Sequence, residues 1–303
     1  MRSPNVAFVI PCFNEAKTIR SVVERALNSV EGSKVYVYDN GSTDETVEEA
    51  IGAGALVALV PERGKGNVVR RMFADVDADV YVMLDGDGTY EIEATAEMVS
   101  LLLKNKADMV IGCRNVVSDQ FAAYRFGHQI GNRVFTSILK TIFHSSCGDV
   151  LSGFRVMTKR FVKSFPIFSK GFEIEVELTA HASFLNVRTL DFQTKYFNRN
   201  NESESNLRTV QDGYKIMRAL FKIFRSYSPS RFFGSFAVLS LVAALIGSLT
   251  DLTKSYQFEF LSFATPATFL VIATLFFTVG VILNAATRQR YEIIRLFYLS
   301  ERI

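Results

Sequence analysis

Short apolar runs alternate with amphipathic stretches through the first 115 residues of the chain. Five runs are expected to form strands: Val6–Ile10, Lys34–Tyr38, Ala55–Val60, Val80–Leu84 and Met109–Ile111. Four stretches between them are expected to form helices: Thr18–Val30, Thr43–Ala53, Gly66–Ala74 and Ile92–Lys104. This alternation predicts an α/β fold with a mostly parallel sheet covered on both faces. In such sheets, ligands bind at the carboxyl ends of the strands.

The pattern is less regular after residue 115. A helix is expected near Arg125–Phe143, a loop around Cys147–Gly153 and a second helix near Phe172–Leu185. The segment Leu207–Tyr227 then carries apolar residues at helical spacing beside lysines and arginines. Such a basic amphipathic segment is either a surface helix of the domain or, next to a membrane span, an interfacial helix on anionic headgroups.

Two long uncharged stretches follow, Phe232–Leu249 with 18 residues and Phe260–Thr287 with 28 residues. A membrane span needs about 20 apolar residues, so both are expected to cross a bilayer, with a buried soluble hairpin as the alternative. Lysines and arginines lie before the first stretch and after the second: Lys222, Arg225, Arg231, Arg288, Arg290, Arg295 and Arg302. The positive-inside rule therefore predicts a multi-pass protein of the cell (inner) membrane, with both termini in the cytoplasm.

Composition narrows the class of protein. The net charge of +3 is too small to argue for a nucleic-acid partner. The cysteines Cys12, Cys113 and Cys147 form no CxxC pair, so we expect reduced thiols rather than a zinc site or disulfides. The histidines His128, His144 and His181 lack metal-ligand spacing and are expected to be ordinary polar residues. A strand-like run follows Met1–Pro4 directly, so no signal peptide is expected.

Asp85-Gly86-Asp87 directly follows the apolar run Val80–Leu84. Two carboxylates at positions i and i+2 beyond a strand can reach one hard cation. Mg²⁺ or Mn²⁺ held by one or two carboxylates takes its other ligands from water and from phosphate oxygens. A solvated turn is the alternative explanation for this string alone.

Three further polar segments follow predicted strands. Pro11–Glu15 follows the first strand, and Asp39–Asp44 follows the second, where Thr43 or Ser42 is expected to cap the next helix. Arg63-Gly64-Lys65-Gly66-Asn67 follows the third strand and is a cationic glycine turn suited to phosphate. Because all four segments follow successive strands, we expect them to lie together at one edge of the sheet.

These motifs resemble the inverting GT-A glycosyltransferases of family 2. The similarity is greatest to the polyprenyl-phosphate branch, which includes dolichyl-phosphate mannose synthases and bacterial undecaprenyl-phosphate sugar transferases. It extends from Val6 to about Tyr196 and to the two-span tail. The resemblance implies a GT-A nucleotide-diphospho-sugar transferase fold followed by a transmembrane hairpin. It also implies that Asp85 and Asp87 hold Mg²⁺ or Mn²⁺. The residues implied to bind the nucleotide sugar are Pro11, Asn14, Glu15, Asp39, Gly41, Ser42, Lys65 and Asp85.

The second half of the motif set is implied to bind the acceptor. Gly112-Cys113-Arg114 and the run Asp149–Arg155 resemble the family's Gly-x-Arg and Asp-x-x-Ser-Gly-x-Arg. The residues implied to contact an acceptor phosphate are Arg114, Arg125, Asn132, Ser152 and Arg155. Those implied to be catalytic are Asp87, Asp149 and Arg155, where Asp149 is either a base or an organiser of the arginines.

Two positions depart from the family pattern. Asn40 stands where a second Asp is usual, and Thr89 stands where the branch often has a Gln that could add a metal ligand. The third protein ligand of the cation is therefore left open by the sequence.

The resemblance divides the chain into four segments. These are a cytoplasmic GT-A catalytic domain (1–200), a basic interfacial segment (201–231), two transmembrane helices (232–287, about 232–250 and 263–287) and a basic cytoplasmic tail (288–303). Homo-oligomerisation is left open.

The implied activity is transfer of a sugar from a nucleotide-diphosphate sugar to a membrane polyprenyl phosphate, either undecaprenyl or dolichyl phosphate, for cell-surface glycan synthesis. Three alternatives remain: a transferase that acts on a hydroxyl of a lipid-linked sugar, a non-catalytic sugar-nucleotide-binding assembly partner, and a processive polysaccharide synthase. The last typically carries a Gln-x-x-Arg-Trp motif, and the chain contains no Trp, which counts against it.

Overall fold

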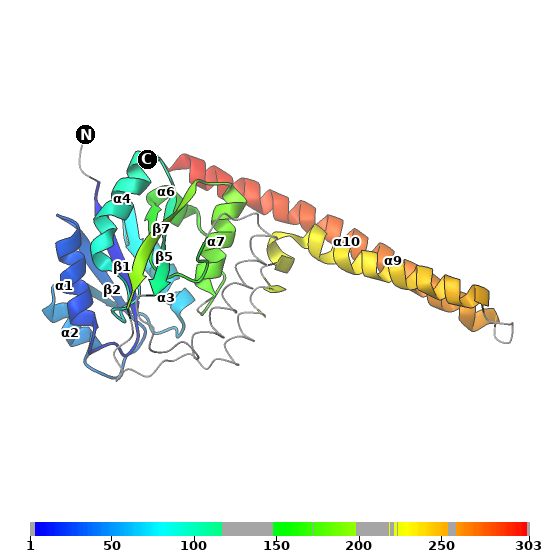
Figure 1. Cartoon of the computed structure of the whole chain (residues 1–303), viewed down its shortest axis with the longest axis horizontal. Coiled ribbons are helices and arrows are strands. Elements are labelled where there is room, and N and C mark those ends of the chain that lie inside the picture. Colours follow the sequence, from blue (N-terminus) through cyan, green and yellow to red (C-terminus); the bar gives the residue numbers. More distant parts are fainter. Residues whose placement is uncertain are drawn as a thin grey trace. The chain divides into compact units, whose positions relative to one another are not determined.

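The computed structural model describes residues 4–116, 148–171, 173–197, 218, 221, 222, 224–253 and 259–301. The chain divides into two units (Figure 1). The first contains Met1–Ile216 together with Ile294–Ile303, and the second contains Met217–Ile293. The expected helix near Arg125–Phe143 and most of the basic segment Leu207–Tyr227 lie outside the described residues.

One seven-stranded sheet forms the centre of the first unit, in the order β3-β2-β1-β4-β6-β5-β7. Its strands are β1 (Val6–Cys12), β2 (Lys34–Asp39), β3 (Leu56–Leu59), β4 (Val80–Met83), β5 (Met109–Val116), β6 (Arg155–Thr158) and β7 (Thr189–Tyr196). Strands β1, β2, β3 and β4 pair in parallel, as do β5 and β7, whereas β6 is antiparallel to both β4 and β5. The prediction of a mostly parallel α/β sheet is therefore confirmed.

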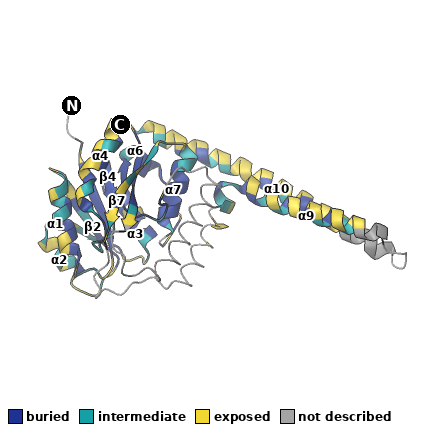
Figure 2. Ribbon diagram, in the orientation of Figure 1, coloured by how far each residue is buried: buried dark blue, intermediate teal, exposed yellow. Residues whose placement is uncertain are grey.

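Helices cover both faces of this sheet. They are α1 (Ile19–Ser29), α2 (Thr46–Gly52), α3 (Lys65–Asp75), the 3₁₀ turn η1 (Ile92–Ala94), α4 (Thr95–Lys104), α6 (Lys159–Ser164) and α7 (Ile174–Leu185). On one face, alternate residues of β1, β2 and β4 pack against α1, α2 and α4 in one apolar core. On the other face, Phe73 of α3 contacts Tyr81 of β4 and Phe165, with ring centroids 6.1 and 6.4 Å apart. Burial on both faces explains why β1 and β4 are uninterrupted apolar runs (Figure 2).

The second unit contains the helix α9 (Pro229–Thr253) and most of the helix α10 (Glu259–Ser300). They lie antiparallel, because Gly247 lies against Pro266 at one end while Gly280 lies against Phe233 further along. A Cβ at Gly280 would be 3.1 Å from the Cβ of Phe233. Small residues at such points allow close approach of membrane helices.

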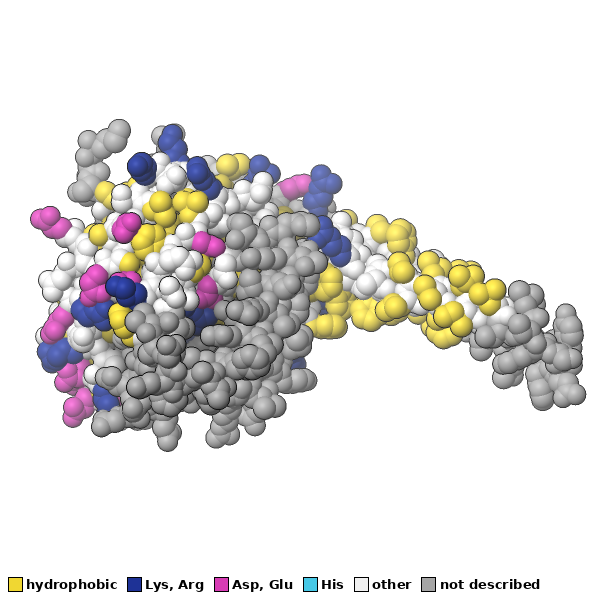
Figure 3. Space-filling model, viewed as in Figure 1, with side chains coloured by type: hydrophobic (Ala, Val, Ile, Leu, Met, Phe, Trp, Pro, Cys, Tyr) yellow, Lys and Arg dark blue, Asp and Glu magenta, His cyan; other side chains and the backbone are white. Residues whose placement is uncertain are grey.

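Both helices are long and apolar enough to cross a membrane, over Pro229–Leu249 and Pro266–Ser300. Only 17% and 11% of their most apolar windows are buried, so their hydrophobic side chains face outward (Figure 3). The core helix of a soluble protein would be mostly buried, which disfavours the soluble-hairpin alternative. The second helix also continues to Ser300, through the basic stretch from residue 288 that the sequence pattern assigns to a separate tail.

The last residues of α10, from Ile294, belong to the first unit. The Tyr298 hydroxyl donates to Asp108 Oδ2 at 2.9 Å, and the Arg160 guanidinium lies 4.8 Å from the centroid of the Tyr298 ring. Arg160 also donates to both carboxylate oxygens of Asp108. The end of α10 is thus held to the first unit at the amino-terminal end of β5.

Candidate active site

The buried thiol of Cys12 lies at the carboxyl end of β1, beside Asp39 of β2 and the Gly86 turn that follows β4. Burial raises the pKa of Cys12 well above its ordinary value, and the charges of Glu15, Asp39, Asp85 and Asp87 raise it further. These acids belong to three loops that are separate in the sequence. A Cβ at Gly86 would lie 2.6 Å from Cys12 Sγ and 3.7 Å from Glu15 Cγ, so the β1 and β4 loops meet at this point, as expected for neighbouring parallel strands.

The first two loops are joined by a hydrogen-bond network. The Asp39 carboxylate accepts from the backbone amides of Gly41 and Ser42, both at 2.9 Å, and from the Ser42 hydroxyl. Ser42 Oγ in turn accepts from the Asn14 amide at 2.8 Å, and Asn14 Oδ1 accepts from the Thr43 amide at 2.8 Å. Asp39 is buried, whereas Asn14 is exposed at the rim of these loops.

Two other predicted nucleotide-binding residues lie beside this network. Pro11 is buried within β1, opposite Tyr38 of β2. Glu15 is partly exposed, and its backbone amide donates to Thr46 Oγ1 at 2.8 Å. The structure therefore brings the predicted nucleotide-binding segments of the β1 and β2 loops together.

The expected helix cap at Ser42 or Thr43 is wrong. Helix α2 begins at Thr46, after Glu45, which makes no side-chain capping bond. Asp44 Oδ1 instead accepts from the Thr46 amide at 3.2 Å and from its hydroxyl. Ser42 and Thr43 bond the β1 loop, so they are not available to the helix.

Asn40 accounts for one departure from the family pattern. Its side-chain amide donates to the carbonyls of Val60 and Glu62, at 3.0 and 2.8 Å, while its oxygen accepts from the Gly64 amide at 2.7 Å. An aspartate could not donate to those carbonyls. Asn40 therefore connects the β2 loop to the glycine turn that carries Lys65.

Asp85 and Asp87 are both partly exposed at the end of β4. Asp87 Oδ1 accepts from the Thr89 hydroxyl at 2.7 Å and from the Thr89 amide at 3.1 Å. Thr89 is itself buried, so it orients Asp87 through this oxygen. Thr89, the second departure from the family pattern, therefore supports the Asp87 carboxylate.

Lys65 lies between two carboxylates. Its ammonium is 2.5 Å from Asp85 Oδ1 and 2.5 Å from Glu175 Oε1 of α7. Burial opposes the charge, but the two carboxylates outweigh it and raise the pKa of Lys65 above its ordinary value. Glu175 is a site residue that the sequence does not predict.

The residues present suit a hard divalent cation. Asp85 and Asp87 offer carboxylate oxygens, which Mg²⁺ and Mn²⁺ prefer. Within the described part of the chain, no group of three His, Cys, Asp or Glu side chains is arranged to hold a metal ion. The protein would therefore supply one or two carboxylates, which is sufficient when a substrate diphosphate supplies other ligands.

The predicted acceptor residues Arg114 and Asp149 form an ion pair. Arg114 donates from Nε and Nη2 to the two oxygens of Asp149, at 2.7 and 2.9 Å. Arg114 also lies 5.5 Å from the ring centroid of Tyr196. Burial opposes the charge of Arg114, but Asp149 outweighs this and raises its pKa above the ordinary value.

The Arg155 guanidinium is held by hydrogen bonds inside the first unit. Its side chain is fully buried, and its guanidinium donates to the carbonyls of Ser152 and Val150 and to the Thr179 hydroxyl, at 3.0, 2.8 and 3.0 Å. Ser152 is also fully buried, and its hydroxyl donates to the Gly112 carbonyl at 2.6 Å. In this structure both residues hold the Asp149–Phe154 loop, and their contact with an acceptor phosphate stays a prediction. Arg125 and Asn132 lie outside the described residues.

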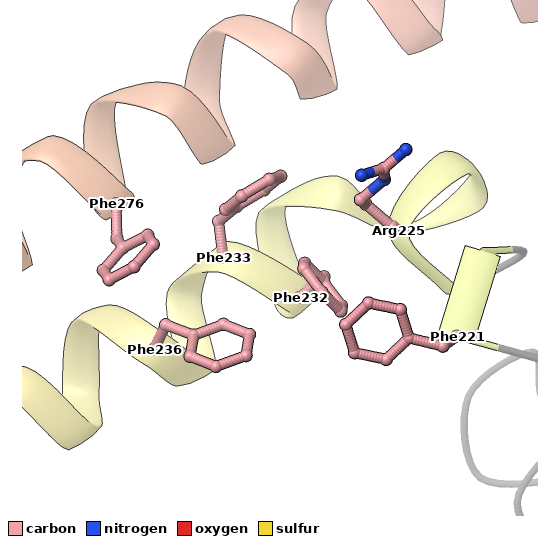
Figure 4. A pocket seen from close by; sticks show the side chains of 6 residues that line it. All are labelled: Phe221, Arg225, Phe232, Phe233, Phe236 and Phe276. Atoms are coloured by element: carbon pink, nitrogen blue, oxygen red, sulfur yellow. The ribbon is translucent and has the colours of Figure 1, made fainter. Parts of the chain in front are cut away.

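A separate cavity of about 300 Å³ lies in the second unit (Figure 4). Five phenylalanines and one arginine form its lining: Phe221, Arg225, Phe232, Phe233, Phe236 and Phe276. Phe221 and Phe232 lie edge to face with ring centroids 4.8 Å apart. The described lining of the cavity is therefore aromatic and apolar, apart from the positively charged Arg225.

Comparison with known proteins agrees with this geometry. The profile of glycosyl transferase family 2 matches residues 7–165. The glycosyltransferase AglJ of Haloferax volcanii is 33% identical over 247 residues, which cover 79% of this chain and 78% of that protein. A dolichol-phosphate mannosyltransferase of Pyrococcus furiosus is 22% identical over 250 residues, which cover 80% of this chain and 70% of that protein.

The fold is shared with a solved structure, glucosyl-3-phosphoglycerate synthase of Mycobacterium tuberculosis in complex with Mg²⁺ and uridine diphosphate. The TM-score is 0.60 and the identity 22%, over 73% of this chain and 79% of that one. The match to the family profile and the extended similarity to AglJ show the family, and the shared fold is of the GT-A type. The chain belongs to glycosyl transferase family 2 and is a glycosyltransferase with a nucleotide-sugar-binding fold.

Proposed function

We propose that this glycosyltransferase moves a sugar from a nucleotide-diphosphate sugar to a polyprenyl phosphate at the cytoplasmic face of a membrane. Asp85 and Asp87 would hold Mg²⁺ or Mn²⁺, and the cation would supply positive charge to neutralise the departing diphosphate. Support for the metal comes from the carboxylate donors and from the Mg²⁺ in the mycobacterial structure. Support for the lipid comes from the two apolar helices and the archaeal mannosyltransferase relative.

One observation carries the proposal: Lys65 and the Asp85-Gly86-Asp87 turn lie together at the carboxyl end of the sheet. The Lys65 ammonium, together with a divalent cation on the Asp85-Gly86-Asp87 turn, would supply the positive charge that suits a diphosphate leaving group. Lys65 is the first residue of α3, and the amino terminus of a helix also favours negative charge. The predicted nucleotide-binding residues on the β1 and β2 loops are adjacent to this point.

In the proposed reaction, a phosphate oxygen of the lipid attacks C1 of the sugar with inversion. The new C1–O bond forms as the bond from C1 to the donor diphosphate breaks, and the nucleoside diphosphate leaves with that electron pair. A phosphate monoester has a second pKa near about 6, so it is largely a dianion at neutral pH. The attacking oxygen therefore needs no base.

The Arg114–Asp149 pair is consistent with this absence of a base. Both carboxylate oxygens of Asp149 accept from Arg114, which favours the organising role over proton abstraction. Arg114 keeps about a quarter of its side chain exposed, so its fork can turn to a phosphate. Arg125 and Asn132 are proposed as further phosphate contacts.

The second unit provides the membrane side of the proposal. We assign 201–231 to the interface, 232–287 to two spans and 1–200 and 288–303 to the cytoplasmic side. The aromatic cavity around Phe232 offers an apolar surface to the prenyl chain, and Arg225 supplies a positive charge for its phosphate or for headgroups. The basic residues that flank the spans support this orientation.

The test is an incubation of membranes containing the protein with radiolabelled UDP-, GDP- and dTDP-sugars and polyprenyl phosphate, with and without EDTA. We expect metal-dependent label in a mild-acid-labile lipid, and its loss in Asp87→Asn. Label in an acid-stable lipid would support a hydroxyl acceptor instead. Donor binding without any transfer would support the non-catalytic alternative.

A further inference from the structure

Glu175 has one carboxylate oxygen with a partner and one without. Its Oε1 accepts from Lys65, whereas its Oε2 is buried and makes no hydrogen bond within the described part of the chain. An unpartnered buried carboxylate oxygen is costly and calls for an explanation. The side chains of Asp85 and Glu175 both accept from this ammonium.

The two carboxylates differ in their access to solvent. The side chain of Asp85 is 30% exposed, whereas those of Glu175 and Lys65 are 5% and 9% exposed. Asp85 can therefore exchange its partner with an ion from solution, and Glu175 cannot. The Lys65 ammonium therefore lies between a carboxylate that solvent can reach, Asp85, and one that is buried, Glu175.

The Glu175 side of this cluster is supported by contacts between the Lys65 turn, the loop before α7 and α7 itself. The Gly66 amide donates to the Lys170 carbonyl at 3.1 Å, and a Cβ at Gly64 would lie 2.1 Å from that oxygen. Glu177 Oε2 accepts from the Ser169 amide at 2.9 Å, which ties the same loop to α7. These contacts keep Lys65 of α3 beside the first turn of α7.

We propose that Glu175 is a positioning residue that retains the Lys65 ammonium when Asp85 exchanges it for a divalent cation. Lys65 then stays beside the donor diphosphate instead of competing with the cation for Asp85. This inference rests on the proposed function, because it assigns the cation to Asp85 and Asp87.

The test measures Mn²⁺ affinity of the purified full-length protein in detergent, by electron paramagnetic resonance of free Mn²⁺ and without donor. In Glu175→Gln, the Lys65 ammonium depends on Asp85 for its ion pair in this cluster, so Mn²⁺ has to displace the whole pair. We expect the Mn²⁺ affinity to fall at least about tenfold. In Lys65→Met the competing ammonium is gone, and we expect binding at least about tenfold tighter than in the wild type.

The double variant separates this role from a simpler one. With Lys65→Met already present, Glu175→Gln should change Mn²⁺ affinity less than about threefold. An equal loss in both backgrounds would overturn the inference, because Glu175 would then act on the cation directly. Glu173→Gln makes the same chemical change just before the first turn of α7 and should leave the affinity unchanged.

Three further outcomes keep the test decisive. If Glu175→Gln does not fold, as judged by its melting temperature, unchanged or weaker Mn²⁺ binding by Lys65→Met overturns the inference alone. If the effect of Glu175→Gln on Mn²⁺ affinity depends on Lys65, but the wild-type protein transfers no sugar to polyprenyl phosphate, the proposed function fails and this inference stands. If the wild-type enzyme transfers sugar, but the effect of Glu175→Gln on Mn²⁺ affinity does not depend on Lys65, the proposed function stands and this inference fails.

Discussion

The guanidinium of Arg114 donates to both oxygens of the Asp149 carboxylate, from Nε at 2.7 Å and from Nη2 at 2.9 Å. The two residues are 35 positions apart in the sequence and belong to β5 and to the loop before β6. Their pairing connects the two motifs that the resemblance assigns to the acceptor. It also determines what should happen when the carboxylate is removed.

Asp149→Asn should retain measurable transferase activity. The asparagine oxygen can still accept from Arg114, and a phosphate dianion needs no base, so we expect kcat to fall less than about tenfold. Loss of a general base would cost about 100- to 10,000-fold. Initial rates at saturating donor and lipid decide between these values. Asp77→Asn, which removes an exposed carboxylate paired with Lys159, is the matched control.

Arg155→Ala should destabilise the first unit. The guanidinium satisfies the carbonyls of Val150 and Ser152 inside the protein, and its removal leaves them unpaired and opens a cavity. We expect a loss of about 3 kcal/mol in the free energy of unfolding, measured by chemical denaturation. Arg188→Ala removes an exposed arginine bonded to one carbonyl and should cost less than about 0.5 kcal/mol. An unchanged stability with weaker lipid binding would instead restore the phosphate-binding role.

Gly66→Ala should impair donor binding through Lys65. An added Cβ would lie 2.3 Å from the Ser169 carbonyl, so the turn has to move away from the loop that precedes α7. We expect KM for the nucleotide sugar to rise at least about tenfold, since a displacement of about 1 Å in a binding group can cost about 100-fold. Gly234→Ala is the control, because no atom lies within 4 Å of its added Cβ. Equal kinetics for the two variants would contradict the role given to the turn.

His181 should make stability depend on pH. Burial lowers the pKa of His181 to about 3, so the folded protein keeps this imidazole neutral. The unfolded chain takes up its proton near pH 6.5, so the stabilisation is complete above that pH. It is lost as pH falls towards 3, by up to about 1.4 kcal/mol per pH unit. Melting temperatures between pH 7.5 and 5 should fall less steeply for His181→Gln. Parallel curves for the two proteins would contradict this prediction.

The apolar runs predicted β1 and β4 well because these two strands are buried on both faces and need no special partner. The strands β6 and β7 were missed for different reasons. Strand β6 begins with Arg155, a charged residue that an apolar pattern does not predict in a buried strand. Its burial is possible because the Ser152 and Val150 carbonyls and the Thr179 hydroxyl accept hydrogen bonds from its guanidinium. Strand β7 alternates polar and apolar residues, with Leu190, Phe192 and Tyr196 packed against the core. That period of two was present in the sequence and could have identified it.

The candidate site was predicted as a set of segments but not as a set of contacts. Asp85, Asp87 and Lys65 could be recognised because each follows a strand in a short polar motif. Glu175 could not, because it lies in a largely apolar helix 110 positions from Lys65, and nothing local marks it. The roles of Asn40 and Thr89 were equally hidden, since each depends on a partner that the fold brings to it.

Local physics in the sequence alone determined the alternating strands and helices, the edge at which their polar loops meet and the two long apolar helices. Backbone geometry and hydrophobic burial act over a few neighbouring residues, so a linear pattern records them. Only the tertiary structure decided which charges are paired. It placed Arg155 in the core, bound Arg114 to Asp149 and set Lys65 between Asp85 and Glu175. The strength of a charge interaction depends on distance and burial in space, and neither quantity is written in the order of residues.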